Sequence, residues 1–385
     1  MKKQLLILLL SVLTLVSCSD DNNHSSNQKT GTLKGKVTTI NTHKAVGGAL
    51  VFAFDDDKNI YHTYTNATGD FTLDAPVGNR ILHIQTGDGS NFRTTIEVAV
   101  QENQTQELDE SLLRLEQTAR MAYVEGDYDS IQNIITTLGY NVESISFSQL
   151  SDYSIVSQYD VIFLNCGSIP IGSAISGHAD ITTNLARFAT NGGSLYASDY
   201  AVAYLIGGEE YTATCNALGG FIPDTTLCST ADGDEATLHT YLTNTELADA
   251  TGLSSLDIIY DLGGWQKINS VDETFWEVLV RETSTEQPLM IRTNHFFDSS
   301  LVGNRVGNSQ NSDWITICHM PDTNSQESIT ITIEATDWPS HQAHGDTLGS
   351  CSGNGMSGTI YYTTFHNNPN VGNSQFILEH VILNL

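Results

Sequence analysis

Hydrophobic and polar positions alternate in short runs along residues 31–115, and turn residues such as Gly, Asp and Asn separate the runs. Alternation with a period of two directs one row of side chains to a core and the other to solvent, as in a half-buried β-strand. Several short strands at this spacing predict a small all-β sandwich. The runs are Leu33–Ile40, Ala49–Phe54, Ile60–Tyr64, Asp70–Leu73, Arg80–Ile84 and Thr94–Val100.

The pattern changes from Ala119, where apolar runs alternate with segments of helical periodicity. Apolar strands that alternate with helices are typical of a parallel sheet covered on both faces. We therefore expect residues 119–385 to form an α/β domain of the doubly wound, flavodoxin-like kind. The expected strands are Arg120–Val124, Asn141–Ile145, Tyr159–Asn165 and Ser194–Ser198, and the expected helices are Tyr128–Leu138 and Ile181–Thr190.

The N-terminus has the layout of a bacterial lipoprotein signal peptide. Two lysines precede an apolar run from Gln4 to Val16, which ends in the sequence Leu-Val-Ser-Cys. We therefore predict that residues 1–17 are a signal peptide and that Cys18 carries lipid such as palmitate. The run is shorter than the roughly 20 residues of a spanning helix, so the lipid would be the membrane anchor. An ordinary secreted protein is the alternative.

Residues 18–30 are expected to form a flexible acidic tether, because they offer almost no apolar side chain to bury. An acidic stretch directly behind a lipidated cysteine resembles the surface-export signal of Bacteroidetes lipoproteins. The resemblance implies a protein of the cell envelope, anchored in the outer membrane and facing outward.

Composition narrows the range of partners. The chain has 45 acidic and 16 basic side chains and a formal net charge of −29, so nucleic acid and anionic membrane surfaces are poor partners. The remaining expected partners are the membrane, through the lipid, and an extracellular ligand or protein. A length of 385 residues exceeds the usual single domain and predicts a multidomain chain.

The β-rich segment carries a recognisable local motif. The stretch Thr65–Leu73 places a turn glycine before Phe71 and Leu73, which point to one face of a strand. It resembles the carboxypeptidase regulatory-like domain, which implies a prealbumin-like sandwich over residues 31–115. Members of that family have no catalytic residues in this module, so the resemblance implies a spacer.

The second segment has motifs of a different family. The pieces DVIFLNCG, LARFATNGGSLYASDYA, IIYDLGGW and GTIYYTTFHNN resemble the class I glutamine amidotransferase-like superfamily, over residues 119–310 and 356–385. Catalytic members need a cysteine in a Gly-x-Cys-x-Gly elbow and a histidine close to a glutamate. Here Ser198 and Asp199 stand at the elbow, and asparagines follow His366. Amidotransferase chemistry is therefore not expected, and Ser198, Asp199 and His366 are the remaining catalytic candidates.

The chain has six cysteines, of which Cys18 is expected to carry lipid. Cysteines close in sequence and exposed to an oxidising compartment are expected to pair. The predicted disulfides are Cys215 with Cys228 and Cys318 with Cys351. Cys166 is left over and is interpreted as a buried structural thiol, with a nucleophile as the alternative.

Residues 313–352 interrupt the α/β pattern and resemble a short module of secreted bacterial proteins, marked by Ile-Cys-His, His-x-x-His-Gly-Asp and a closing Gly-x-Cys. His341 and His344 lie three residues apart, on one side of a helical turn. Cys318 and His319 are neighbours on an expected strand, so they face opposite sides. The metal hypothesis is a zinc site of His319, His341, His344 and Asp346. The favoured alternative is that these histidines only hydrogen-bond nearby groups.

Two classes of function follow from these observations. The absent amidotransferase motif favours a non-catalytic surface protein that binds a ligand or partner. The alternative is an extracellular hydrolase of envelope or glycan material, which requires Ser198, Asp199 and His366 to meet in one pocket.

Overall fold

The computed structural model describes residues 29–212, 215, 217–295, 297–304, 306–307, 313–320, 328–351, 357–367 and 374–385. The expected signal peptide, Cys18 and residues 19–28 of the expected tether lie outside this part of the chain. Within it, no helix combines the length and the apolar character needed to cross a membrane.

Two sheets form the N-terminal β-sandwich, whose strands are the alternating segments of the sequence. Phe71 and Leu73 are buried in its core, as the motif predicted. Gly69 makes the preceding turn with a φ of +80°, and a Cβ there would lie 2.5 Å from the Val37 carbonyl oxygen. One sheet has the order β5 (Asp70–Pro76), β1 (Thr30–Lys36) and β8 (Thr105–Glu107). The other has the order β2 (Thr38–Thr39), β9 (Arg114–Gln117), β7 (Phe92–Val100), β6 (Gly78–Thr86), β3 (Leu50–Phe54) and β4 (Ile60–Tyr64).

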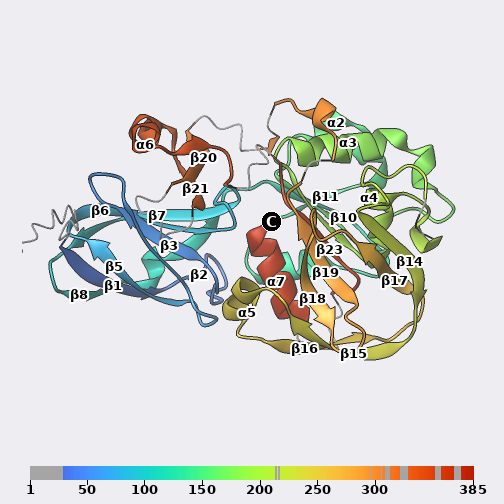
Figure 1. Cartoon of the computed structure of the whole chain (residues 1–385), viewed down its shortest axis with the longest axis horizontal. Coiled ribbons are helices and arrows are strands. Elements are labelled where there is room, and N and C mark those ends of the chain that lie inside the picture. Colours follow the sequence, from blue (N-terminus) through green and yellow to red (C-terminus); the bar gives the residue numbers. More distant parts are fainter. Residues whose placement is uncertain are drawn as a thin grey trace, which may run out of the picture.

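A nine-stranded sheet forms the centre of the α/β domain (Figure 1). Its first five strands are parallel, in the order β11 (Glu143–Ile145), β10 (Met121–Val124), β12 (Val161–Leu164), β13 (Ser194–Ser198) and β23 (Ile360–Thr363). The antiparallel remainder has the order β19 (Pro288–Thr293), β18 (Glu277–Glu282), β15 (Ala236–Leu242) and β16 (Ser255–Tyr260).

Helices cover both faces of the parallel half. Phe163 and Tyr361 share a core with helices α1 (Ile131–Thr137) and α7 (Ser374–Asn384). Their chain neighbours Ile162 and Tyr362 point to the opposite face and share a core with α3 (Ala179–Thr190). This two-sided burial explains why the strands are apolar throughout rather than alternating.

The antiparallel half corrects the expectation of a doubly wound parallel sheet throughout. Parallel neighbours need a crossover of a dozen or more residues, whereas only residues 283–287 connect β18 to β19. Helix α5 (Thr245–Thr251) lies between β15 and β16, and these two strands are also antiparallel. A separate ribbon pairs β14 (Leu227–Gly233) with β17 (Trp265–Val271).

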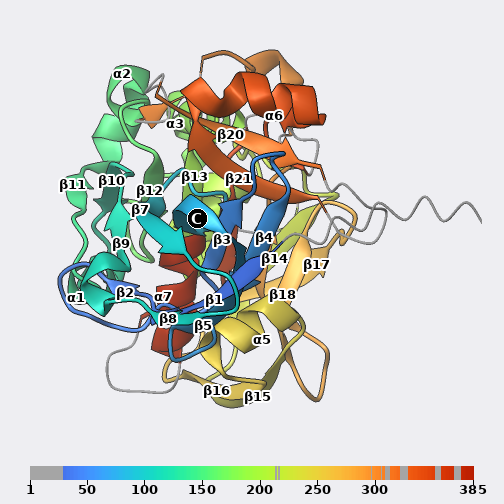
Figure 2. The ribbon, with the colours of Figure 1, turned by 90° about the vertical axis from the view of Figure 1, so that its left-hand side faces the viewer.

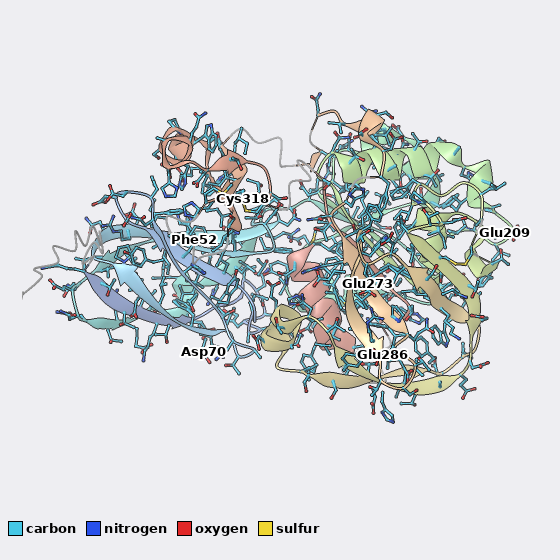
Figure 3. The ribbon with its side chains drawn as sticks, in the orientation of Figure 1. Phe52, Asp70, Glu209, Glu273, Glu286 and Cys318 are labelled. Atoms are coloured by element: carbon cyan, nitrogen blue, oxygen red, sulfur yellow. A yellow bond between two sulfur atoms is a disulfide. The ribbon has the colours of Figure 1, made fainter. Side chains whose placement is uncertain are left out.

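The inserted module lies on the β-sandwich, although the chain enters and leaves it from the α/β domain (Figures 1 and 2). Gln85 of the sandwich accepts a hydrogen bond from the Thr332 amide (3.2 Å) and donates one to the Thr330 carbonyl (3.3 Å). Its elements are β20 (Trp314–His319), β21 (Ile329–Glu334), α6 (Trp338–His344) and β22 (Thr347–Leu348). A joint apolar core consists of Leu50, Phe52 and Ile60 with Ile317, Ile331 and Ile333. Figure 3 labels Phe52 in the sandwich and Cys318 in the module above it.

The sandwich also packs directly on the α/β domain. The side-chain amide of Asn91 donates to the Leu385 carbonyl (2.6 Å), and Lys44 pairs with Glu379 of α7 (2.6 Å). One apolar core runs through both domains without a break. The β-sandwich is therefore a packing partner for the other two parts of the chain.

Candidate functional site

A strand-to-helix turn of the α/β domain follows β13, which lies next to the central strand β23 of the nine-stranded sheet. Ser198 ends this strand, and Asp199 begins a helical turn that continues into α4 (Ala203–Ile206). Asp199 has a φ of +45°, which is uncommon for a residue with a side chain and is typically retained at functional or switching sites. Asp199 thus stands at the position that the resemblance noted in the sequence assigned to the elbow.

Three ionisable side chains meet at this elbow. The carboxylate of Asp199 lies 3.5 Å from the Cys166 sulfur and 3.8 Å from Nδ1 of His366, and it accepts a hydrogen bond from the Gln266 amide (2.7 Å). Burial raises the pKa of Asp199 to about 6, although the Gln266 hydrogen bond and His366 act in the opposite direction. Burial likewise raises the pKa of Cys166, so this thiol is a poor nucleophile near neutral pH.

The third catalytic candidate, Ser198, is held away from His366. Its hydroxyl donates to the Asp129 carboxylate (2.5 Å) and accepts from the Cys166 amide (3.0 Å). Among the described residues, no hydrogen bond joins Ser198 to a histidine. The structure therefore brings Asp199 and His366 together and leaves Ser198 as part of their support.

Asp129 is the residue that the sequence analysis missed. It is buried after β10, and its carboxylate accepts from the amides of Ser130 (2.6 Å) and Asn367 (3.1 Å) in addition to Ser198. Burial raises its pKa, against the effect of these hydrogen bonds and of His366. The only signal in the sequence is a position just beyond the carboxyl end of a parallel strand, where polar groups of such sheets converge.

A second cluster lies in the inserted module, around Asp346. Its carboxylate lies within hydrogen-bond distance of Nδ1 of three histidines, His319 (2.9 Å), His341 (2.6 Å) and His344 (3.0 Å). It also accepts a hydrogen bond from the Met320 amide (2.8 Å). All four residues of the metal hypothesis therefore meet at one point. His319, His344 and Asp346 each offer a ligand atom within 4.8 Å of the other two.

Hydrogen bonds and burial shift the pKa values of Asp346 and His341 in this cluster. Burial acts to raise the pKa of Asp346, but hydrogen bonds from Met320 and the histidines outweigh it and hold the pKa below its ordinary value. Burial lowers the pKa of His341, although Asp346 opposes this shift. The cluster thus combines a carboxylate anion with a histidine that tends to be neutral.

Disulfides are present at both positions where sequence proximity suggested them. One joins Cys318 to Cys351 in the inserted module, and the other joins Cys215 to Cys228. Cys166 is buried as a free thiol. The side chain of His319, the neighbour of Cys318, contacts Asp346 (2.9 Å).

A cleft of about 1070 Å³ lies where the sandwich, the module and the α/β domain meet. Ser194 and Thr359 at the amino ends of β13 and β23 line it, so it is at the opposite end of the sheet from Asp199. Tyr64 and Phe275 add aromatic surface, with 53% and 37% of these residues exposed. This site between three parts of the chain was not predicted, because no local motif encodes it.

Comparisons with known proteins leave the family of the chain open. No protein-family model matches it, and neither does any curated protein. A protein from Bacteroides uniformis named for carbohydrate binding is 12% identical over 24% of this chain and 44% of its own length, with a TM-score of 0.19. A protein from Thermoplasma acidophilum named as a GMP synthase subunit is 9% identical over 70% of this chain and 96% of its own, with a TM-score of 0.35.

Proposed function

We propose that this chain is a lipid-anchored protein of the cell envelope that binds an uncharged, hydroxyl-rich ligand, such as an oligosaccharide, in the cleft between its three parts. The observation that carries this proposal is the cleft itself. Its volume of about 1070 Å³ accommodates several sugar rings, and ligand sites commonly lie at domain junctions.

The side chains of the cleft support this choice of ligand. Exposed rings such as Tyr64 and Phe275 offer flat apolar surface with little entropy to lose, and the nearby carboxylates accept hydrogen bonds from hydroxyl groups. Arg292 lies in the cleft but pairs with Glu277 (2.7 Å) and approaches Glu246 (3.8 Å). Negative charge therefore prevails, and an anionic ligand would be repelled.

The elbow supports a second candidate function, hydrolysis of envelope or glycan material. Burial raises the pKa of Asp199 to about 6, and its carboxylate lies 3.8 Å from Nδ1 of His366, so the two side chains would form the acid–base pair. This chemistry would use Asp199 in place of Ser198. Hydrolysis of a model ester that disappears in Asp199→Asn would support it.

Titration calorimetry with a panel of neutral oligosaccharides and peptidoglycan fragments tests the binding proposal. We expect Tyr64→Ala and Phe275→Ala to weaken binding at least tenfold without loss of folding. Tyr128→Ala is the matched control, because Tyr128 is 46% exposed and pairs with Tyr211 on the elbow side. Weaker binding in Tyr128→Ala, with no effect of Tyr64→Ala or Phe275→Ala, would move the ligand site to the elbow.

The anchor has a separate test. Cys18→Ser removes the thiol that would be acylated, so the variant should leave the membrane fraction. Membrane fractionation unchanged from the wild type would contradict the anchor and leave the cleft proposal intact.

A further inference from the structure

The histidine cluster of the inserted module combines the chemistry of a metal site with a buried, closed position. Two imidazoles and a carboxylate converge from separate points of a short segment. We propose that His319, His344 and Asp346 bind one divalent transition-metal ion, zinc by preference, in a structural site, and that His341 positions Asp346 for this role.

The spacing of the ligand atoms supports this assignment. Nδ1 of His319 and Nδ1 of His344 lie 2.9 and 3.0 Å from the two carboxylate oxygens of Asp346. Tetrahedral zinc with bonds of about 2.0–2.1 Å separates neighbouring ligand atoms by roughly 3.3 Å. Both nitrogen–oxygen separations therefore lie within a few tenths of an ångström of this value, and all three ligand atoms lie within 4.8 Å of one another.

The donor set selects the class of metal. Imidazole nitrogen and carboxylate oxygen together suit zinc and its transition-metal neighbours, whereas calcium and magnesium prefer all-oxygen sites. Thiolate does not take part, because Cys318 is bonded to Cys351. The site thus differs from the cysteine-rich structural zinc sites of small domains.

The local backbone holds the ligands in place without help from the metal. His341 and His344 lie on the last turn of α6, and Gly345 with a φ of +112° reverses the chain so that Asp346 faces them. The Asp346 amide donates to the His341 carbonyl (3.0 Å), and the nearby disulfide fixes β20, which ends at His319. Ligands held by such a frame lose little freedom on binding.

Burial indicates a structural role rather than a catalytic one. The exposed fractions of the side chains are 2% for His319, 0% for Asp346 and 8% for His344, so the fourth position of a tetrahedral ion would be closed to bulk solvent and to a substrate. Phe54 of the sandwich sets its ring edge-on to His319 and His341 at 5.4 and 4.7 Å between centroids. The ion would therefore hold the module where it contacts the sandwich.

His341 differs from the other two histidines. Its Nδ1 lies 2.6 Å from the Asp346 carboxylate, but it is not part of the group whose ligand atoms all lie within 4.8 Å. A histidine that hydrogen-bonds a ligating carboxylate orients it, and loss of such a partner typically costs about 10–100-fold in metal affinity.

The first test is elemental analysis of the full-length chain, purified in detergent without chelator or histidine tag. We expect about one zinc ion per chain in the wild type and in the control His178→Gln, whose histidine lies in the α/β domain. Asp346→Asn and His344→Gln should lose the metal. His341→Gln should keep the stoichiometry and bind about 10–100-fold more weakly; complete loss in this variant would overturn its positioning role.

A measurement on the wild type keeps the proposal testable if a variant fails to fold. Dialysis against a chelator should lower the thermal transition of the module, and zinc should restore it. Cobalt(II) should give the visible absorption bands of a tetrahedral ion. Absence of metal in the purified chain, together with a transition that neither chelator nor zinc moves, would overturn the site and leave Asp346 as a hydrogen-bonded hub.

Discussion

The elbow and the histidine cluster are both buried groups of ionisable side chains, yet they are built in different ways. The histidine cluster takes all its members from residues 319–346, from one strand end, one helical turn and the residue after the helix cap. The elbow joins Asp129, Cys166, Asp199 and His366, which come from four separate loops of the sheet. A local cluster can be recognised from spacing, whereas a dispersed one needs the topology.

The two clusters also differ in how well their carboxylates are accommodated. Four donors surround Asp346 and hold its pKa below the ordinary value. Asp199 has one firm hydrogen bond, a backbone in the left-handed region and a pKa raised to about 6. Backbone strain and an unfavourable charge are tolerated at functional sites. These two features therefore favour a functional role for the elbow and a structural role for the histidine cluster.

The largest expected effect is loss of the module disulfide. Cys318→Ser with Cys351→Ser opens a loop of sequence separation 33 and should destabilise the module by about 4 kcal/mol in the chain-entropy model. Hydrogen exchange of the β20 and β21 amides measures this effect.

The other disulfide provides the control. Cys215→Ser with Cys228→Ser should cost about 3 kcal/mol and leave exchange in the module unchanged. If the β20 amides stay protected from hydrogen exchange in the variant Cys318→Ser with Cys351→Ser, the contact with the sandwich alone holds this region in place.

The support of the elbow is the next test. Asp129→Ala leaves the Ser198 hydroxyl and the Asn367 amide without their buried acceptor, at an expected cost of about 3 kcal/mol. Chemical denaturation followed in the α/β domain measures the loss. Asp127 is an exposed neighbour, so Asp127→Ala is the control and should change stability by less than about 0.5 kcal/mol. Equal effects of the two substitutions would contradict a supporting role of Asp129 at the elbow.

The sequence predicted those parts that depend on local patterns. Alternation identified the sandwich strands and the buried pair Phe71 and Leu73, and sequence proximity suggested both disulfides. The antiparallel half of the sheet was not predicted, because apolar runs alone do not reveal strand direction. Asp129 was missed because its contact with Ser198 spans 69 positions of the chain, which no local pattern reveals.

The charge on Asp199 predicts a pH dependence. Its pKa is about 6 in the folded protein and ordinarily 3.8, so the folded state binds the proton more tightly than the unfolded state. Stability should therefore rise as the pH falls from above 6 towards 4.

Replacement of this carboxylate isolates its contribution. Asp199→Asn should flatten the pH dependence and gain about 2 kcal/mol at pH 7, since a two-unit shift sets a limit of about 3 kcal/mol. Denaturation midpoints at pH 4.5 and 7.5 test this. A midpoint difference identical in wild type and variant would mean that Asp199 carries no unfavourable charge.

The smallest expected effect concerns the turn that brings Asp346 to the histidines. Gly345 has a φ of +112°, and a Cβ there would meet no atom within 4 Å, so the cost of Gly345→Ala is conformational rather than steric. We expect about 1 kcal/mol of destabilisation from Ala and less from Asn, which tolerates the left-handed region better. Thermal unfolding of both variants measures the difference. Equal losses for Ala and Asn would show that tolerance of the left-handed region does not decide which residue is accepted at this turn.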